Sequence, residues 1–454
     1  MSDVTIARRR FDPSTIALVI ALVIGLPLLL WLGRGMTFFS DEWAFIQTRS
    51  LGDPGTWLTP HNEHWTTLPV IVYRLLVETV GLRTYVPYLA AVVALHGLVV
   101  TFTFIAIRRS SGPLAAVAVA ILLLVYGSGF ENLYWGFQTG FVGATAAGIA
   151  ALLALDRHDD RGRWGVSILL LIGLATVGVA LAFCVAVAVE SLVARRLRSM
   201  FVPLAIPALV YAAWFVAFGR FGIRTGTALS ASAFIDVPSA IITGLSNAAG
   251  AITGVGPNLG IVPAVGIAVW AAVRMWRDRG LPPRFVGCIA GIAVLYGLIG
   301  LTRSHDFTGI IGYTRYTYVS GILLLIAVGS LAGRIRLPEA PNRRLLAMVP
   351  LGGLLAVALV FNARLLLDGR DLFLTRAART RALITVAMER PLPATTDPNR
   401  SLVLVPSPAV LETLLARYGS PLSDVLVPWA VEPIPPDILA TARKGLAEGI
   451  EIPH

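Results

Sequence analysis

Two neighbouring carboxylates, Asp41 and Glu42, lie in an aromatic-rich stretch shortly after the first long apolar run. Burial among aromatic rings raises the pKa of a carboxyl group toward the range that suits a general base. Successive helical residues point about 100° apart, so one acid can face a substrate while the other faces elsewhere. The alternative is structural, because Ser40 followed by two acids also matches a helix N-cap with an acidic first turn. The pair therefore has either a catalytic or a capping role.

A second polar group, His61, Glu63 and His64, follows in the same stretch. Contact with a polar substrate is our first interpretation. The second is a divalent metal site that would also use Asp41, although the spacing is no recognised zinc motif. The third is anchoring of the loop at the membrane interface by Trp65. A spacing of three residues would place both histidines on one helical face, but nearby prolines favour a turn.

A third group of polar and aromatic residues lies between two later apolar runs. Its members are Glu131, Asn132, Trp135 and Gln138. An aromatic belt at the membrane interface would account for the tryptophan alone. The carboxylate and the two amides are the side chains that hold hydroxyl-rich ligands such as sugars, since they offer both donors and acceptors. We therefore predict that this group contacts a substrate.

Two arginines, Arg303 and Arg315, flank one short connection, and Tyr316 follows the second of them. A planar guanidinium suits bidentate capture of a phosphate. The alternative is that each arginine extends to the lipid headgroups without any substrate. We predict that Arg303, Arg315 and Tyr316 bind a substrate phosphate.

The residues that must position these groups are mostly apolar. Of the 454 residues, 56% are hydrophobic and 14% are charged, and the mean hydropathy is +0.76, values typical of a polytopic membrane protein. Cys184 and Cys288 lie inside apolar runs, which argues against a disulfide framework or a cysteine metal site. Residues 236–256 are either a further short span or an interfacial segment. About eleven predicted spans cover 14–33, 84–107, 113–127, 138–155, 165–178, 180–194, 200–219, 259–276, 285–301, 315–333 and 345–361.

The basic residues cluster in alternate connections between these spans. By the positive-inside rule those connections and the N-terminus are cytoplasmic, so the net charge of +11 needs no nucleic-acid partner. All the polar groups described above then lie on the extracytoplasmic side. The predicted cytoplasmic connections are 108–112, 156–164, 195–199, 277–284 and 334–344.

Two parts of unequal size are expected along the chain. Residues 1–361 form an all-α transmembrane domain, whose first outer loop, 34–83, carries the predicted site. Residues 362–454 are richer in proline and charge, and they predict a small extracytoplasmic α/β domain that contains the C-terminus. Within it, 401–406 is predicted as a strand and 410–417 as a helix.

In its order of features the sequence resembles the GT-C superfamily of integral-membrane glycosyltransferases, such as protein mannosyltransferases and aminoarabinose transferases. An acid pair follows the first span in a long outer loop that contains a further helix over 69–81. A Tyr-Trp-Gly-Phe-Gln stretch enters the fourth span, a short helical hairpin covers 165–194, and Arg315-Tyr316 opens a late span. The resemblance covers the chain to about residue 219.

The resemblance implies an inverting glycosyltransferase of the plasma (inner) membrane that uses a polyprenyl-phosphate sugar. Asp41 would be the general base that deprotonates a glycan, lipid or protein acceptor, and Arg315 or Arg303 would stabilise the departing phosphate. The acceptor, the donor or a divalent metal ion would contact four first-loop residues, Glu42, His61, Glu63 and His64. Apart from that metal ion, the resemblance implies no cofactor.

The main rival function is a transporter or flippase of lipid-linked saccharides. A transporter requires ionisable residues inside the spans, along a path through the membrane. The predicted spans are almost free of charge apart from Glu190 and Arg274 near their cytoplasmic ends. The concentration of polar groups in the outer loops favours an enzyme.

Overall fold

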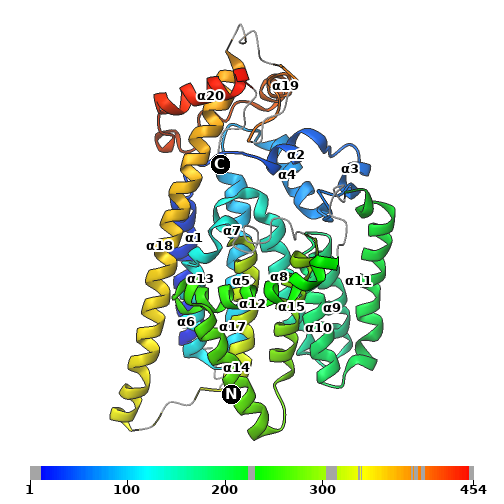
Figure 1. Ribbon diagram of the computed structural model, residues 1–454, viewed down its shortest axis with the longest axis vertical. Coiled ribbons are helices and arrows are strands. Elements are labelled where there is room, and N and C mark those ends of the chain that lie inside the picture. Colours follow the sequence, from blue (N-terminus) through cyan, green and yellow to red (C-terminus); the bar gives the residue numbers. More distant parts are fainter. Residues whose placement is uncertain are drawn as a thin grey trace, which may run out of the picture.

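The computed structural model describes residues 12–222, 231–302, 314–335, 340–389 and 404–448, together with 338, 392 and 397–399. Figure 1 shows the long helices side by side in a bundle, with shorter helices gathered at one end. The long helices are α1 (Pro13–Leu32), α5 (Val86–Ser110), α6 (Pro113–Leu124), α8 (Thr139–Leu155), α9 (Asp160–Leu174), α10 (Ala180–Val193), α11 (Leu197–Ala217), α12 (Ala231–Thr253), α14 (Ile261–Asp278), α15 (Pro283–Thr302), α17 (Thr314–Ala332) and α18 (Pro341–Met388).

The helix α1 begins and is covered as expected for a membrane span. The Asp12 carboxylate accepts hydrogen bonds from the backbone N–H groups of Ser14 (3.0 Å) and Thr15 (3.2 Å), which caps the helix. Pro13 occupies its first position, where the missing N–H costs nothing. Large apolar side chains such as Val23 are exposed on its outer face, where lipid covers them in a membrane.

Every one of the eleven predicted spans coincides with a helix. Among the described residues, seven helices are long and apolar enough to cross a membrane, and a bent pair of helices would make an eighth. Of the other predicted spans, α9 and α10 are short, with 15 and 14 residues, and α14 carries charge at its end. The segment 236–256 belongs mainly to α12, which is not among the seven. The described chain is thus an all-α polytopic membrane protein.

The bent pair brings a polar segment into the bundle. After α6 the chain turns by 54° into η1 (Gly127–Gly129) and α7 (Phe130–Tyr134), and η2 (Gly136–Gln138) follows. The turn needs glycine because a Cβ atom on Gly127 would lie 2.0 Å from the carbonyl oxygen of Asn362 in α18. The segment therefore packs against α18 instead of continuing along the axis of α6.

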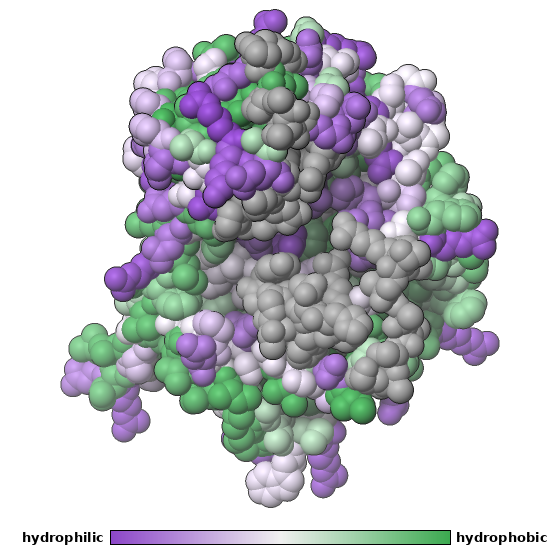
Figure 2. Space-filling view, turned by 45° about the horizontal axis from the view of Figure 1, so that its top comes forward, coloured by the Kyte–Doolittle hydropathy of each residue, from purple (hydrophilic) through white to green (hydrophobic). Residues whose placement is uncertain are grey.

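The short helices at one end of the bundle form what we call the cap. Figure 1 shows them above the ends of the long helices, and Figure 2 shows hydrophilic residues over the cap and apolar residues along the flanks of the bundle. The elements of the cap are α2 (Asp41–Thr48), α3 (Gly55–Leu58), α4 (Thr67–Thr79), α19 (Pro408–Tyr418), η5 (Pro428–Ala430) and α20 (Pro436–Glu448). Elsewhere lie η3 (Gly219–Gly222) and α13 (Gly256–Leu259).

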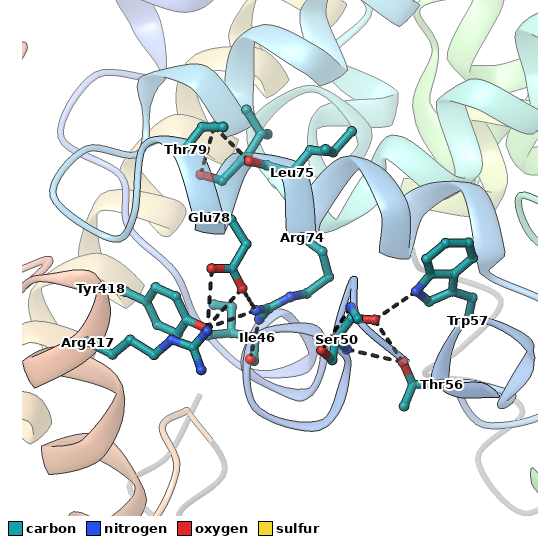
Figure 3. A network of polar contacts seen from close by, with 12 residues as sticks. Ile46, Ser50, Thr56, Trp57, Arg74, Leu75, Glu78, Thr79, Arg417 and Tyr418 are labelled. Atoms are coloured by element: carbon teal, nitrogen blue, oxygen red, sulfur yellow. Dashed lines mark hydrogen bonds and ion pairs between the residues drawn. The ribbon is translucent and has the colours of Figure 1, made fainter. Parts of the chain in front are cut away.

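The first loop and the C-terminal segment build this cap together, through the polar network of Figure 3. The buried Arg74 of α4 donates to the Ile46 carbonyl (2.7 Å) and the Tyr418 hydroxyl (2.9 Å), and it pairs with Glu78. Arg417 of α19 lies 3.5 Å from the same Glu78 carboxylate. Residues more than 300 positions apart therefore share one set of hydrogen bonds.

A buried arginine of α18 fixes the chain where it leaves α1. The Arg381 guanidinium donates to the carbonyl oxygens of Gly35 (2.9 Å), Met36 (3.3 Å) and Pro421 (3.3 Å). These bonds join the start of the first loop to α18 and to the C-terminal segment.

The C-terminal part differs from the predicted α/β domain. Its described residues form helices, with α19 covering the predicted helix 410–417. The predicted strand 401–406 falls partly on 401–403, outside the described residues, and 404–406 are not in a strand. α18 continues through the predicted boundary between residues 361 and 362, which joins both parts by one helix of 48 residues. The division into two domains stays a prediction.

Candidate functional site

The helix α2 begins at an unusual backbone conformation. Ser40 has φ 54° and ψ −124°, a region that disfavours residues other than glycine, and its N–H donates to the carbonyl of Leu404 (3.0 Å). Ser40 occupies the N-cap position of α2, as the structural alternative predicted, although its side chain makes no capping hydrogen bond. The two acids nonetheless occupy the first turn of α2, where the helix dipole favours negative charge. The C-terminal segment thus holds the residue that directly precedes Asp41.

Glu42 is completely buried. Its carboxylate accepts hydrogen bonds from the hydroxyls of Tyr73 and Tyr85 (2.8 Å) and from the Phe39 N–H (2.9 Å). Burial raises the pKa of the Glu42 carboxyl to about 7, although these hydrogen bonds oppose the rise. A Cβ atom on Gly136 would lie 3.0 Å from the Glu42 Oε1 atom, so only glycine fits beside the acid. Glu42 therefore fixes α2 from within and does not face solvent.

Asp41 points away from this buried network. Its side chain is 36% exposed, and its Oδ1 atom lies 3.6 Å from the Nε2 atom of His61. The divergence of Asp41 and Glu42 agrees with the geometry expected for neighbours on one helix. Asp41 is thus the acid of the pair that an external hydroxyl group can reach.

The two histidines lie on a turn, as the prolines around them predicted. The backbone N–H groups of His61 and His64 each donate to the other residue's carbonyl, at 3.1 and 3.0 Å. The His61 ring packs edge-on against Phe45 and Phe137, with ring centroids 5.3 and 5.2 Å away. The packing fixes the imidazole that lies next to Asp41.

The four residues proposed as alternative metal ligands form acid–histidine pairs. Besides the pair of Asp41 and His61, the Nε2 atom of His64 lies 3.6 Å from the Glu63 carboxylate. Within the part of the chain that the structure describes, no group of three or more His, Cys, Asp or Glu side chains could hold a metal ion. The described residues therefore do not support a metal site built from these four.

Aromatic rings connect the acids to two arginines. Phe39 stacks on Trp135 with ring centroids 4.8 Å apart, and Phe137 lies 5.1 Å beyond Trp135. The Cζ atom of Arg315 lies 6.0 Å from the Trp135 ring, and that of Arg376 lies 5.8 Å from the Phe39 ring. The structure thereby brings the residues just before α2, the start of η2, and the helices α17 and α18 together around one aromatic stack.

The remaining predicted site residues differ in their surroundings. The Glu131 carboxylate accepts from the Thr314 hydroxyl (3.0 Å) and the Arg315 N–H (3.1 Å), so it caps the start of α17. Asn132 and Gln138 are completely buried, and Tyr316 packs against Phe141 with ring centroids 5.7 Å apart. Arg303 lies outside the described residues.

Sequence reasoning missed four residues that shape the site: Tyr73, Tyr85, Arg376 and Arg381. The two tyrosines belong to apolar, helix-forming stretches in which nothing marks them as partners of an acid. The two arginines lie after residue 361, in the part that was predicted to form a separate domain. The available signal was the continuation of helix-forming residues through 388, beyond the end of the apolar run.

In chemical terms the arrangement offers a reachable carboxylate, a neighbouring imidazole and guanidinium groups near an aromatic surface. A carboxylate can accept a proton from a hydroxyl group, and guanidinium groups stabilise a phosphate that gains negative charge. Aromatic faces bind the apolar faces of ring-shaped ligands. These are the requirements for transfer of a group from a phosphate to a hydroxyl.

Comparison with known proteins gives a fold. No protein-family model and no curated protein matches this chain. Similar solved structures include apo ArnT from Cupriavidus metallidurans, with a TM-score of 0.54 and 16% identity over 93% of this chain and 90% of that one. ArnT from the same organism bound to undecaprenyl phosphate has a TM-score of 0.47 and 15% identity over 95% of this chain and 89% of that one. The similarity to apo ArnT shows that this chain shares the overall fold of that protein.

Proposed function

We propose that the protein is a membrane glycosyltransferase that moves a sugar from a polyprenyl-phosphate donor to a glycan, lipid or protein acceptor. The observation that supports it most is the position of Asp41. A reachable carboxylate at the start of α2 lies beside His61, and the His61 ring packs on Phe137 of the same aromatic stack that Arg315 contacts at Trp135, within a fold similar to that of ArnT.

The proposed reaction is a single displacement. Asp41 takes the proton of the acceptor hydroxyl, and the hydroxyl oxygen attacks the anomeric carbon of the donor sugar. The bond from that carbon to the phosphate oxygen breaks, and its electron pair leaves with the lipid phosphate. Arg315 stabilises the charge on the leaving phosphate. A single displacement inverts the anomeric configuration.

The charges at the two ends of the bundle support an extracytoplasmic site. At the end opposite the cap, Arg108 pairs with Asp12 (3.3 Å), and both Arg109 and Arg284 pair with Asp156 (2.8 Å each). The positive-inside rule assigns an arginine-rich end to the cytoplasm. The cap, the acid pair and the C-terminal helices then lie on the other side of the membrane.

The experiment is an assay of the purified protein in lipid nanodiscs with polyprenyl-phosphate sugars. We expect release of polyprenyl phosphate when an acceptor is present. Arg315→Gln should lower the rate constant by about 10²-fold, because one stabilising group of the leaving phosphate is lost. Arg277→Gln, at the charged end of α14, is the matched control and should keep the wild-type rate.

Two results would contradict the proposal. The wild-type protein could release no polyprenyl phosphate from any donor, with any glycan, lipid or protein acceptor. Alternatively, in sealed vesicles it could move the intact lipid-linked sugar across the bilayer without cleaving it, which would identify a transporter.

A further inference from the structure

Two buried amides in the segment 128–139 have no hydrogen-bond partner. Asn132 and Gln138 are both 0% exposed, yet the nitrogen and the oxygen of each side-chain amide are unpaired. A buried amide without partners is unfavourable, and native proteins satisfy the great majority of such groups. Two of them within seven residues therefore call for an additional binding partner.

The same segment holds further unpaired polar atoms. The hydroxyl oxygens of Ser128, Tyr134 and Thr139 are also buried without a partner. No stretch of similar length elsewhere among the described residues holds more than three such atoms. The concentration in one segment distinguishes it from isolated imperfections of packing.

The position of this segment connects it to the proposed reaction. At Gly136 it lies directly against Glu42, since a Cβ atom there would come within 3.0 Å of the Glu42 Oε1 atom. At Glu131 it binds the N–H of Arg315 (3.1 Å). The segment that carries the unpaired amides thus contacts both α2, which carries the proposed base, and the start of α17, which carries the proposed phosphate ligand.

The chemistry of the unpaired atoms indicates the kind of ligand. Amides and hydroxyls donate and accept hydrogen bonds but carry no charge, which matches the hydroxyl groups of a sugar. The one carboxylate of the segment, Glu131, already accepts two hydrogen bonds at the start of α17.

We propose that Asn132 and Gln138 bind the hydroxyl groups of the sugar on the lipid-linked donor, while Arg315 binds its phosphate. The proposal rests on the proposed function and assigns the sugar and the phosphate to different elements of the site. It predicts that the two amides contribute to the binding of a sugar-bearing lipid and not to the binding of sugar-free polyprenyl phosphate.

The test uses apolar replacements of similar size, Asn132→Leu and Gln138→Leu, in the full-length protein. We expect each to weaken binding of polyprenyl-phosphate glucose roughly ten-fold, because sugar hydrogen bonds are lost. Binding of polyprenyl phosphate without a sugar should not change. The unfolding midpoint of each variant should equal or exceed that of the wild type, since an unpaired buried amide is removed.

The matched control is Asn362→Leu. Asn362 is equally buried, but its amide accepts from the Ser128 N–H (3.0 Å) and donates to the carbonyls of Ala251 (2.8 Å) and Ala358 (3.0 Å). This variant should unfold at a lower midpoint, in contrast to the two test variants. The difference in unfolding midpoint distinguishes an amide that binds a ligand from an amide that stabilises the fold.

Two results would overturn the inference. The test variants could unfold at a lower midpoint, as expected if ordered water satisfies the amides for stability alone. The test variants could lose the same binding affinity for the sugar-bearing lipid as for polyprenyl phosphate without a sugar. If the wild type cleaves no lipid-linked sugar at all, the proposed function itself fails.

Discussion

The buried acid of the pair gives a quantitative prediction about pH. Burial raises the pKa of Glu42 from 4.5 to about 7, so the folded protein holds this proton more tightly than the unfolded chain does. The free energy of unfolding that Glu42 contributes is therefore largest below pH 4.5, falls as the pH rises toward 7, and is constant above. A shift of this size corresponds to about 3 kcal/mol.

The perturbation that isolates this effect is Glu42→Gln. The glutamine oxygen can still accept from Tyr73 and Tyr85, but its NH₂ group meets the Phe39 N–H, a loss of about 1 kcal/mol at every pH. The stability advantage of the wild type over the variant should therefore shrink by about 3 kcal/mol between pH 4.5 and 7.5.

The assay is equilibrium unfolding in mixed detergent micelles at a series of pH values, for both proteins. An advantage that stays constant with pH would show that Glu42 titrates normally. An advantage that grows with pH would show that the tyrosine hydrogen bonds outweigh burial and lower the pKa. Either result would refute the description of Glu42 as a buried acid with a raised pKa.

Three further substitutions test the surroundings of the site. Gly136→Ala places a methyl group 3.0 Å from the Glu42 Oε1 atom and should lower the free energy of unfolding by about 1–3 kcal/mol in the same micelle assay. Arg381→Lys loses hydrogen bonds to three carbonyls, and it should cost about 2 kcal/mol and speed proteolysis of the C-terminal segment; unchanged proteolysis would count against its role in the cap. Tyr418→Phe removes one acceptor from Arg74 and should cost about 1 kcal/mol while activity remains, as measured by unfolding and by phosphate release.

The bundle was largely predictable because long apolar runs are a strong and local signal. Each predicted span coincides with a helix, and the turn at His61–His64 follows from local proline chemistry. The opposite directions of Asp41 and Glu42 follow from helical geometry. The predicted site contained the side chains that can take part in chemistry. The sequence did not show which of the two acids would be buried.

The contacts that complete the site were not predictable because they join distant parts of the chain. Arg381 binds the carbonyl of Gly35 across 346 positions, and the Arg74–Tyr418 bond spans 344. No local pattern encodes such pairs. The helix α18 also continues to 388, whereas its span was predicted to end at 361 because its later turns mix arginines with leucines and lose the hydropathy of a span.

Glu131 and its neighbours show what the hydrogen bonds of the fold add to the residue types. A carboxylate between two spans was predicted to bind a substrate, and the structure shows it capping the start of α17. Its neighbours Asn132 and Gln138, predicted on the same grounds, are the side chains whose amides have no partner in the described chain. The hydrogen bonds of the folded protein distinguish the Glu131 carboxylate from the two amides, whereas the residue types alone do not.

The most direct test of the account compares Asp41→Asn with Asp53→Asn, an exposed acid of the same loop that bonds the Gly55 N–H (3.0 Å). Release of polyprenyl phosphate from a polyprenyl-phosphate sugar is measured with acceptor present, and the unfolding midpoint of each variant is recorded. The account predicts that Asp41→Asn lowers the rate by about 10²–10⁴-fold without lowering the midpoint, while Asp53→Asn keeps the wild-type rate. A wild-type rate in folded Asp41→Asn would contradict the assignment of Asp41 as the general base.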